Sequence, residues 1–352
     1  MARRSGSAVT LRDVAELVGV TPAAVSMALS GSTRISADTK RRVQEAADDL
    51  GYVPSSAGRA LRSKKAGSIA LIVPNSARHV FGHSYFMHVL NGVTAVANER
   101  DTQLLISTST TEANGITAYE RVLHSRSADG AIVTSSAVDD PNIERLTEAG
   151  LPVVLIGNFP DLPHAVSIGQ DDRRASRLIT EHLIVQHGKR SLAHVTGSLD
   201  HQTGIDRRDG FVDALAAHGI TDEPVVVEGD FSERAGAAAV ERLVAGPMPD
   251  GIVLANDDMA FGAMTALRAR GVRVPQDVAL VGFDDFGVAR LTTPGITTMH
   301  VPAEQMGVDA AQLLFDLISE SSTSTRRIDV EPVLVARDSC GCPPRTEPVH
   351  DS

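Results

Sequence analysis

The chain has 352 residues, enough for two or three domains, and 42% of them are hydrophobic, which allows sizeable cores. The formal net charge of the whole chain is −11. Residues 1–65 hold eleven Lys and Arg against six Asp and Glu, a net of +5, so the remaining residues have a net charge of −16. A basic start suits a phosphate backbone, whereas an acidic remainder is repelled by it and must be held away from it.

The first ten residues, MARRSGSAVT, are polar and basic and lack the apolar segment of a secretory signal. The chain also has no apolar run of about 18 residues. We therefore expect a cytoplasmic protein without a membrane span.

The stretch at residues 9–29, VTLRDVAELVGVTPAAVSMAL, predicts two short helices joined by a tight turn. Apolar residues recur at spacings of three and four from Leu11 onward, which indicates a first helix that Gly19 ends. Thr21 is a favourable N-cap and Pro22 a favourable first helical residue. A helix-turn-helix of this kind lays its second helix in the DNA major groove. The outward residues of that helix are Pro22, Ala23, Ser26 and Met27.

A third helix is predicted between the N-cap Ser36 and the stop at Gly51. The basic run from Lys40 to Arg42 either contacts the DNA backbone or forms a solvated face. After it, SSAGRALRSKK at residues 55–65 predicts a helix of small residues that is too short to be stable alone.

From Val9 to Lys65 the chain resembles the head and hinge of the lactose-repressor (LacI/GalR) family. The matching segments are TLRDVAELVGVTPAAVS, SADTKRRVQEAADDLGYVP and PSSAGRALRSKK. The resemblance implies that the hinge helices of two subunits pair in the minor groove, where Leu61 wedges between base pairs. The residues expected to contact DNA are Thr10, Thr21, Pro22, Ala23, Ser26, Met27, Ala57, Gly58 and Leu61.

Two residues depart from the family pattern. Met27 stands where relatives usually carry Arg or Asn, so the operator sequence cannot be carried over. Gly58 stands where a hinge usually has Ala, which costs about 1 kcal/mol of helix propensity and favours a hinge that is easily released. Two ordinary amphipathic helices separated by a glycine remain the alternative for the first stretch alone.

From Gly67 onward, short runs rich in β-branched residues alternate with helical segments. Strands are predicted at 68–75, 102–110, 130–136, 152–158, 191–197, 224–230, 251–256 and 278–285. Helices are predicted near 85–99, 113–126, 142–149, 173–186, 207–217, 235–244 and 259–270. The alternation indicates parallel sheets covered on both faces.

The predicted fold is an N-terminal all-α helix-turn-helix head followed by a doubly wound α/β core of two lobes. The core resembles a periplasmic sugar-binding protein, as the family resemblance implies. We expect a DNA-binding domain at 1–53, a hinge helix and linker at 54–66, the core at 67–340 and a polar tail at 341–352. The first lobe is expected at about 67–158 and 290–320, and the second at about 159–289 and 321–340.

Ligand space in such a fold lies at the carboxyl ends of the strands, in the cleft between the lobes. On the family motifs, RRDGF nominates Arg207 as a donor to ligand oxygens, and VGFDDF nominates Asp284 as an acceptor. With no Trp and only three Tyr, a ring that packs on a sugar must come from Phe, and GDFSE nominates Phe231. The expected effector site comprises Thr134, Asn158, Arg207, Phe231, Asn256 and Asp284, with Asp257 as a further candidate.

Each candidate also has a structural interpretation. Asn256 and Asp257 suit the N-cap of the following helix, and Asp284 can simply order a turn. Arg207 can pair on the surface with Asp206 or Asp209.

The histidines and cysteines give no strong metal signal. His79, His83 and His88 are interpreted as loop and surface residues. Cys340 and Cys342 are interpreted as tail thiols, because a zinc site requires four ligands. We expect neither a metal nor a cofactor.

Enzyme motifs are missing: the chain has no phosphate-binding Gly-rich loop with its Lys, no G-x-S-x-G and no H-E-x-x-H. We therefore expect a non-enzymatic transcription regulator, most simply a repressor, that binds a near-palindromic double-stranded operator as a homodimer. Its effector is expected to be sugar-like or nucleoside-like. The alternative is a cytoplasmic sugar-binding or sensing protein without DNA regulation, which the basic head disfavours.

Overall fold

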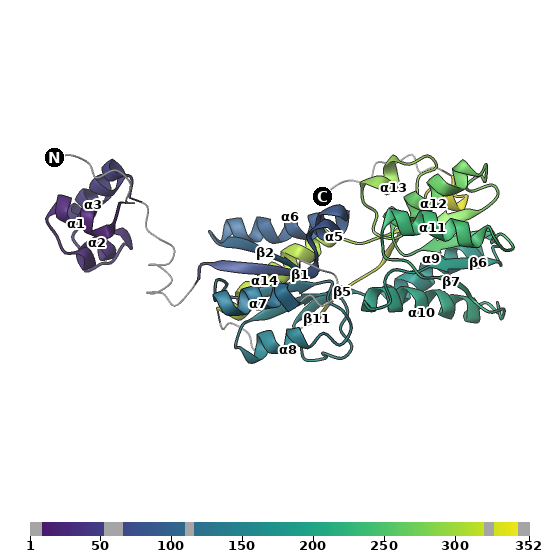
Figure 1. Ribbon diagram of the computed structural model, residues 1–352, viewed down its shortest axis with the longest axis horizontal. Coiled ribbons are helices and arrows are strands. Elements are labelled where there is room, and N and C mark those ends of the chain that lie inside the picture. The colour runs from purple at the N-terminus through teal and green to yellow at the C-terminus, as the bar shows by residue number, and fades with distance from the viewer. Residues whose placement is uncertain (1–8, 53–65, 110–115, 320–326, 344–352) are drawn as a thin grey trace. The chain divides into compact units, whose positions relative to one another are not determined.

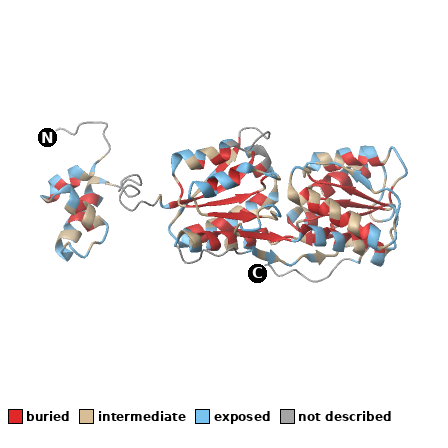
Figure 2. Cartoon of the chain, turned by 90° about the horizontal axis from the view of Figure 1, so that it is seen from below, coloured by how far each residue is buried: buried red, intermediate tan, exposed pale blue. Residues whose placement is uncertain are grey.

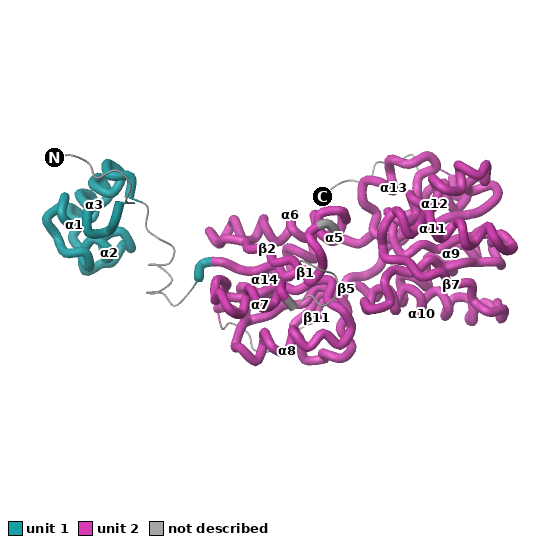
Figure 3. The backbone as a smooth tube through the Cα atoms, viewed as in Figure 1, with its two compact units in different colours: residues 1–67 teal, residues 68–352 magenta. Residues whose placement is uncertain are grey.

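The computed structural model describes residues 9–52, 66–109, 116–319 and 327–343. They belong to two compact units, Met1–Gly67 and Ser68–Ser352, which Figure 3 colours separately. The predicted hinge, with Ala57, Gly58 and Leu61, lies outside the described residues. None of the described helices combines the length and the apolar character that a membrane crossing requires.

The described part of the first unit is a three-helix head, as predicted (Figure 1). Its helices are α1 (Leu11–Val18), α2 (Pro22–Leu29) and α3 (Ala37–Leu50). The hydroxyl of Thr21 accepts the backbone N–H of Ala24 at 3.2 Å, and Gly19 ends α1 in the left-handed conformation. The three helices share one core, formed by Val14, Ala15, Val18, Val25, Ala28, Val43, Ala46 and Ala47.

The basic run of α3 binds within the head. Lys40 donates to the carbonyl of Gly31 at 3.0 Å, and Arg42 donates to the carbonyl of Val18 at 2.8 Å. Arg42 therefore satisfies the carbonyl of the last residue of α1, and Lys40 satisfies a carbonyl just after α2. Arg41 forms exposed ion pairs on its own helix, which contribute little to stability.

The first lobe of the core unit is a six-stranded parallel sheet with helices on both faces. Its strands, in spatial order, are β11 (Arg327–Val330), β5 (Ser167–Gln170), β4 (Val153–Ile156), β3 (Ala131–Thr134), β1 (Ser68–Ser76) and β2 (Gln103–Ser109). Alternate residues of β1 face opposite layers, so that Ile69 packs with α6 (Ser84–Glu99) and α14 (Ala303–Ile318), whereas Ala70 packs with α7 (Ile116–Ser125) and α8 (Pro141–Glu148). The short helix α5 (Ala77–Gly82) follows β1 directly.

The second lobe is a four-stranded parallel sheet with the order β7-β6-β8-β9. The strands are β7 (Val225–Val227), β6 (Leu192–Val195), β8 (Gly251–Leu254) and β9 (Ala279–Val281). The covering helices are α9 (Asp172–His187), α10 (Gln202–Ala217), α11 (Glu233–Leu243), α12 (Asp257–Ala269) and the short α13 (Gly287–Leu291). Figure 2 shows the central strands of both lobes buried between helices whose outer faces are exposed. A small antiparallel sheet of β10 (Thr298–His300) and β12 (Val333–Val335) leads to the 3₁₀ turn η1 (Asp338–Cys340).

The lobe boundaries differ from those expected. Strands β5 and β11 belong to the first sheet, where β5 pairs with β4 and β11 pairs along all of β5. The return to the first lobe also comes later than residue 290, because Ile296 still packs in the core of the second lobe. Periodicity in a sequence can indicate a strand but does not show which neighbour it pairs with, and no strand was predicted at 167–170.

Helices α6 and α14 cross closely because glycines lie where they meet. A Cβ atom on Gly92 would lie 2.0 Å from the carbonyl oxygen of Glu304, and one on Gly307 would lie 2.4 Å from that of Val89. There is no room for a methyl group at either position, so the two helices behave as one packed layer.

We expect Gly92→Ala to lower the free energy of unfolding by about 2 kcal/mol or more, because the helices must separate to admit the methyl group. Urea unfolding followed by circular dichroism measures this. The matched control is Gly246→Ala, since no heavy atom lies within 4 Å of a Cβ there. Equal urea midpoints for the two variants would contradict the close crossing.

Candidate functional site

A cavity of about 340 Å³ lies between the two lobes of the core unit. Its lining residues follow the carboxyl ends of strands in both sheets: Thr134 ends β3, Gln170 ends β5, and Asn256 and Asp284 follow β8 and β9. Doubly wound sheets bind ligands at this edge.

All six residues predicted for the effector site line this cavity, which leaves their ligand role as a prediction. Asp257 does not line it. That side chain is buried, and its carboxylate accepts the backbone N–H of Asp285 at 2.7 Å, so it orders the turn. Burial and the nearby carboxylate of Asp284 hold the pKa of Asp257 well above its ordinary value. The next residue, Asp258, lines the cavity instead.

Arg207 is buried at the centre of the second-lobe wall. Its guanidinium pairs with Asp172 at 2.8 Å and lies 3.7 Å from a carboxylate oxygen of Asp284. It also stacks 3.9 Å above the ring of Phe283 and donates to the carbonyl of Ala255. A planar, delocalised cation is well suited to this combination of ion pairing and ring stacking.

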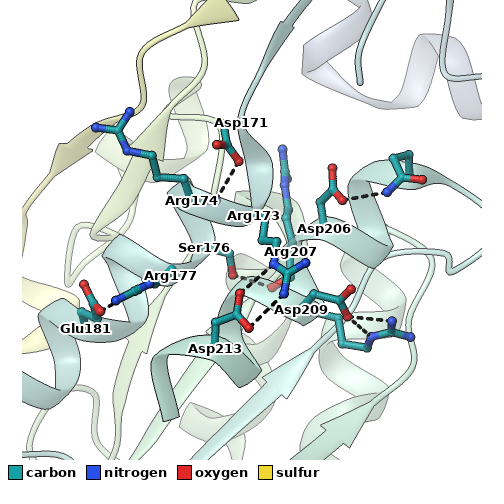
Figure 4. A network of polar contacts seen from close by, with 12 residues as sticks. Asp171, Arg173, Arg174, Ser176, Arg177, Glu181, Asp206, Arg207, Asp209 and Asp213 are labelled. Atoms are coloured by element: carbon teal, nitrogen blue, oxygen red, sulfur yellow. Dashed lines mark hydrogen bonds and ion pairs between the residues drawn. The ribbon is translucent and has the colours of Figure 1, made fainter. Parts of the chain in front are cut away.

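The surface pairing considered for Arg207 does not occur. Asp209 pairs with Arg208 at 2.7 Å, and Asp206 accepts from the amide of Asn158 at 2.8 Å. Figure 4 shows Arg207 on α10 beside the exposed ion pairs of α9 and α10, among them Arg173 with Asp213.

The cavity holds more carboxylates than cations near Arg207. Burial raises the pKa of Asp284 to about 7; Arg207 opposes the rise, and Asp258 and Asp172 add to it. Burial also raises the pKa of Asp172, although its pairing with Arg207 lowers it. For Arg207, burial lowers the pKa, but the two carboxylates outweigh it and the net direction is upward. The guanidinium of Arg207 therefore stays charged, and carboxylates outnumber cations around it.

Asn256 caps α12, as its structural interpretation predicts, and it also lines the cavity. Its side-chain oxygen accepts the N–H of Met259 at 2.9 Å and so caps α12, while its amide nitrogen donates to the carbonyl of Phe231 at 2.9 Å. Phe231 adopts a φ of 66°, and its ring occupies the space beside Gly197, where a Cβ would lie 1.9 Å from Cζ. Asn256 thus fixes the backbone of Phe231, a residue that also lines the cavity.

Asp284 has a φ of 112°, in the region that favours glycine. It lies in a turn, as considered, and its carboxylate also lines the cavity. Strained backbone of this kind concentrates at functional sites, where surrounding contacts must hold it.

Several cavity residues escaped prediction. The side chain of Gln170 is buried, and neither of its amide atoms has a hydrogen-bond partner within the described residues. His83 lies between α5 and α6, a loop position as predicted, but it is not a surface residue, since it lines the cavity with Nδ1 3.3 Å from Asp258. Aromatic rings of the first lobe also line the cavity, namely Tyr85, Phe86 and Phe159. His83 and Tyr85 follow the carboxyl end of the strand predicted at 68–75, and this position was the one signal that could have pointed to them.

The interpretation of Cys340 and Cys342 as thiols of a polar tail is also wrong. Cys340 is 1% exposed within η1, and no disulfide joins it to Cys342. Both thiols lie beside the end of α9. His88 stacks on Phe286 with ring centroids 4.4 Å apart, and the side chain of His79 is outside the described residues.

In the head, the predicted reading face of α2 is open. Thr21, Pro22 and Ala23 are exposed, and Ser26 and Met27 are partly exposed. The helix carries no charged side chain, so its positive N-terminal end is not offset by an acidic residue. Thr10 is exposed and forms a capping box with Asp13, whose carboxylate accepts at 2.7 Å.

A helix-turn-helix head followed by a two-lobed ligand-binding core defines a class of DNA-binding transcription regulators. The family model for bacterial regulatory proteins of the lacI family matches residues 10–55, and the model for a periplasmic binding protein-like domain matches residues 180–340. The HTH-type transcriptional regulator CelR of Thermobifida fusca is 36% identical over 94% of this chain and 98% of its own length. The chain therefore belongs to the lacI family and is a transcription regulator.

Solved structures agree with this assignment. A transcriptional regulator CelR-cellobiose complex matches with a TM-score of 0.71 and 33% identity, covering 94% of this chain and 99% of that one. The lac repressor dimer bound to operator and the anti-inducer ONPF matches with a TM-score of 0.83 and 25% identity, covering 95% and 99%.

We expect Asp284→Asn to stabilise the protein at pH 8 by on the order of 2 kcal/mol, with the gain shrinking toward pH 5. The folded-state pKa of Asp284 lies above that of an unfolded carboxyl group, so ionisation of the native side chain lowers stability as pH rises through about 7. Thermal unfolding between pH 5 and 8 measures the difference. Asp222→Asn, at an exposed position, is the control. A variant that is less stable than wild type at pH 8 would refute the assigned shift.

Proposed function

We propose that this regulator is a homodimeric repressor whose affinity for a near-palindromic operator is set by a neutral sugar bound between its lobes. The observation that carries the proposal is the cavity built around Arg207, Asp172 and Asp284. The protein then acts by binding in the cytoplasm, without catalysis.

The DNA part of the proposal rests on the head. Its net positive charge suits phosphate, and α2 offers a small, uncharged reading face of Pro22, Ala23, Ser26 and Met27. These side chains suit apolar contacts such as the thymine methyl group. A symmetric dimer reads two half-sites one helical turn apart, which a single head cannot hold, and the lac repressor relative was solved as a dimer on operator. In our proposal the hinge residues Ala57, Gly58 and Leu61 contact the minor groove.

The ligand part rests on charge and shape. Asp172 and Asp284 flank the guanidinium of Arg207, and Asp258 adds a further carboxylate near Asp284, so a ligand with its own negative charge would be repelled. Aromatic rings from both lobes suit the C–H faces of a pyranose, and the amide of Gln170 offers a donor and an acceptor. The CelR relative was solved with cellobiose, a neutral disaccharide.

Coupling follows from contacts that cross the cleft. Asn158 of the first lobe donates to Asp206 on α10, and His83 pairs with Asp258 on α12. A sugar that prefers one closure of the lobes shifts the population of that closure. Its effect on DNA affinity is bounded by its differential affinity for the two states.

A sugar sensor without DNA regulation is the competing function. The basic head and the family of the chain disfavour it. Selection of bound duplexes from a random pool, with the full-length chain at about 0.15 M salt, separates the two functions. One enriched palindrome supports the regulator, whereas the absence of enrichment both with and without a bound sugar supports the sensor.

We expect Ala23→Glu to weaken binding to the selected operator by about 100-fold, because a carboxylate enters the groove. An acidic residue in the first turn favours the helix itself, so the head stays folded. Fluorescence anisotropy with a labelled duplex gives the affinities. Gln44→Glu adds the same charge on α3 and is expected to change affinity far less. Equal losses in the two variants would contradict recognition through α2.

We expect Gln170→Leu to weaken sugar binding by about 10-fold or more while leaving the unliganded protein at least as stable as wild type. The substitution removes two buried polar atoms that lack protein partners and that a ligand can satisfy. Calorimetric titration with cellobiose, or with another neutral sugar that binds better, measures the affinity. The control Gln305→Leu lies on the exposed side of α14. Unchanged affinity would remove Gln170 from the site.

A further inference from the structure

We propose that His182, His187, Cys340 and Cys342 form a structural Zn²⁺ site in the second lobe. The two histidines lie in the last turns of α9, and the two cysteines lie at and just after η1, near the end of the described chain. The four ligand atoms all lie within 4.8 Å of one another.

Four of the six distances between the ligand atoms match the edges of a tetrahedral site, and the other two are below 4.8 Å. The Nε2 atoms of His182 and His187 are 3.3 Å apart, and Sγ of Cys342 lies 3.6 Å and 3.5 Å from them. Sγ of Cys340 lies 3.4 Å from Nε2 of His182. Zinc bonds of about 2.05 Å to nitrogen and about 2.3 Å to sulfur give tetrahedral edges of about 3.4 Å between nitrogens and about 3.5 Å between nitrogen and sulfur.

Hydrogen bonds alone do not account for this arrangement. Nε2 of His182 lies within 3.6 Å of three polar atoms, in His187, Cys340 and Cys342. A neutral imidazole nitrogen offers either one proton or one lone pair, so it can satisfy one of the three. A central cation bound by two imidazoles and two thiolates satisfies all four ligands together.

A tight turn places the sulfur atoms of both cysteines beside the histidines. Gly341, between them, adopts a φ of 103°, and a Cβ there would lie 3.4 Å from the ring of His187. Ser339 anchors the turn by donating to the carbonyl of Leu280 at 2.6 Å. The hydroxyl of Thr297 lies 3.0 Å from Sγ of Cys340, where it can donate to a thiolate.

A site with four protein ligands leaves no open position, which is typical of structural zinc. It would fasten the chain after β12 to the C-terminal end of α9. The first turn of the same helix carries Asp172, the partner of Arg207. The ion would therefore stabilise the helix that forms one wall of the sugar cavity, without taking part in sugar or DNA binding.

The test uses the full-length chain with any affinity tag removed, loaded with Zn²⁺ alone, desalted and analysed by mass spectrometry for metal. We expect one Zn²⁺ per chain and a rise in melting temperature on loading. Loading with Co²⁺ instead should give the intense visible bands of a tetrahedral ion and a thiolate-to-cobalt charge-transfer band.

Cys342→Ser and His182→Gln are expected to lower Zn²⁺ affinity at least tenfold and to abolish the charge-transfer band or weaken it. His124→Gln changes an exposed histidine on α7 and should retain one ion. Circular dichroism checks that each variant is folded. If His182→Gln does not fold, the result for Cys342→Ser alone decides the test. A folded wild type without bound Zn²⁺, a Co²⁺ spectrum without thiolate bands, or full Zn²⁺ content in Cys342→Ser would overturn the site.

Discussion

The core unit depends on one buried cation. The guanidinium of Arg207 has lost most of its water, so it must be paired where it lies, and a buried charge left alone costs several kcal/mol. Asp172 begins α9 and pairs with Arg207 of α10 at 2.8 Å, so this ion pair joins the two helices, while Asp284, after β9, lies 3.7 Å from the same guanidinium. The same atoms form the wall of the cavity. The packing of the second lobe and the wall of the cavity therefore depend on one cluster.

Close helix packing makes each lobe rigid, whereas polar contacts connect one lobe to the other. In the first lobe α6 and α14 cross at glycines, and in the second a Cβ on Gly236 of α11 would lie 2.0 Å from a backbone oxygen of α12. Between the lobes the described contacts include single polar pairs such as Asn158 with Asp206. Packed layers resist deformation, whereas isolated polar pairs exchange readily with water. Each lobe is therefore suited to move as one body when a ligand enters.

Local chemistry explains which features could be predicted from the sequence. Caps such as Thr21 and stops such as Gly19 act within a few residues, so the helices of the head were correct almost to the residue. Family motifs found Arg207 and Asp284 because both lie in contiguous patterns. Gln170 was missed because its strand, SIGQ, lacks a run of β-branched residues and was therefore not predicted. The cluster of His182, His187, Cys340 and Cys342 was missed because the histidines and cysteines are far apart in the sequence and come together only in the folded chain.

We propose that the carboxylate-rich cavity around Arg207 selects a neutral sugar. The most direct measurement is the shift in melting temperature of the wild-type protein at pH 8 across neutral oligosaccharides, uronic acids, sugar phosphates and nucleosides. We expect a concentration-dependent rise in melting temperature with at least one neutral sugar and none with the charged analogues. Stabilisation by a uronate or a sugar phosphate, with no effect of any neutral sugar, would contradict it.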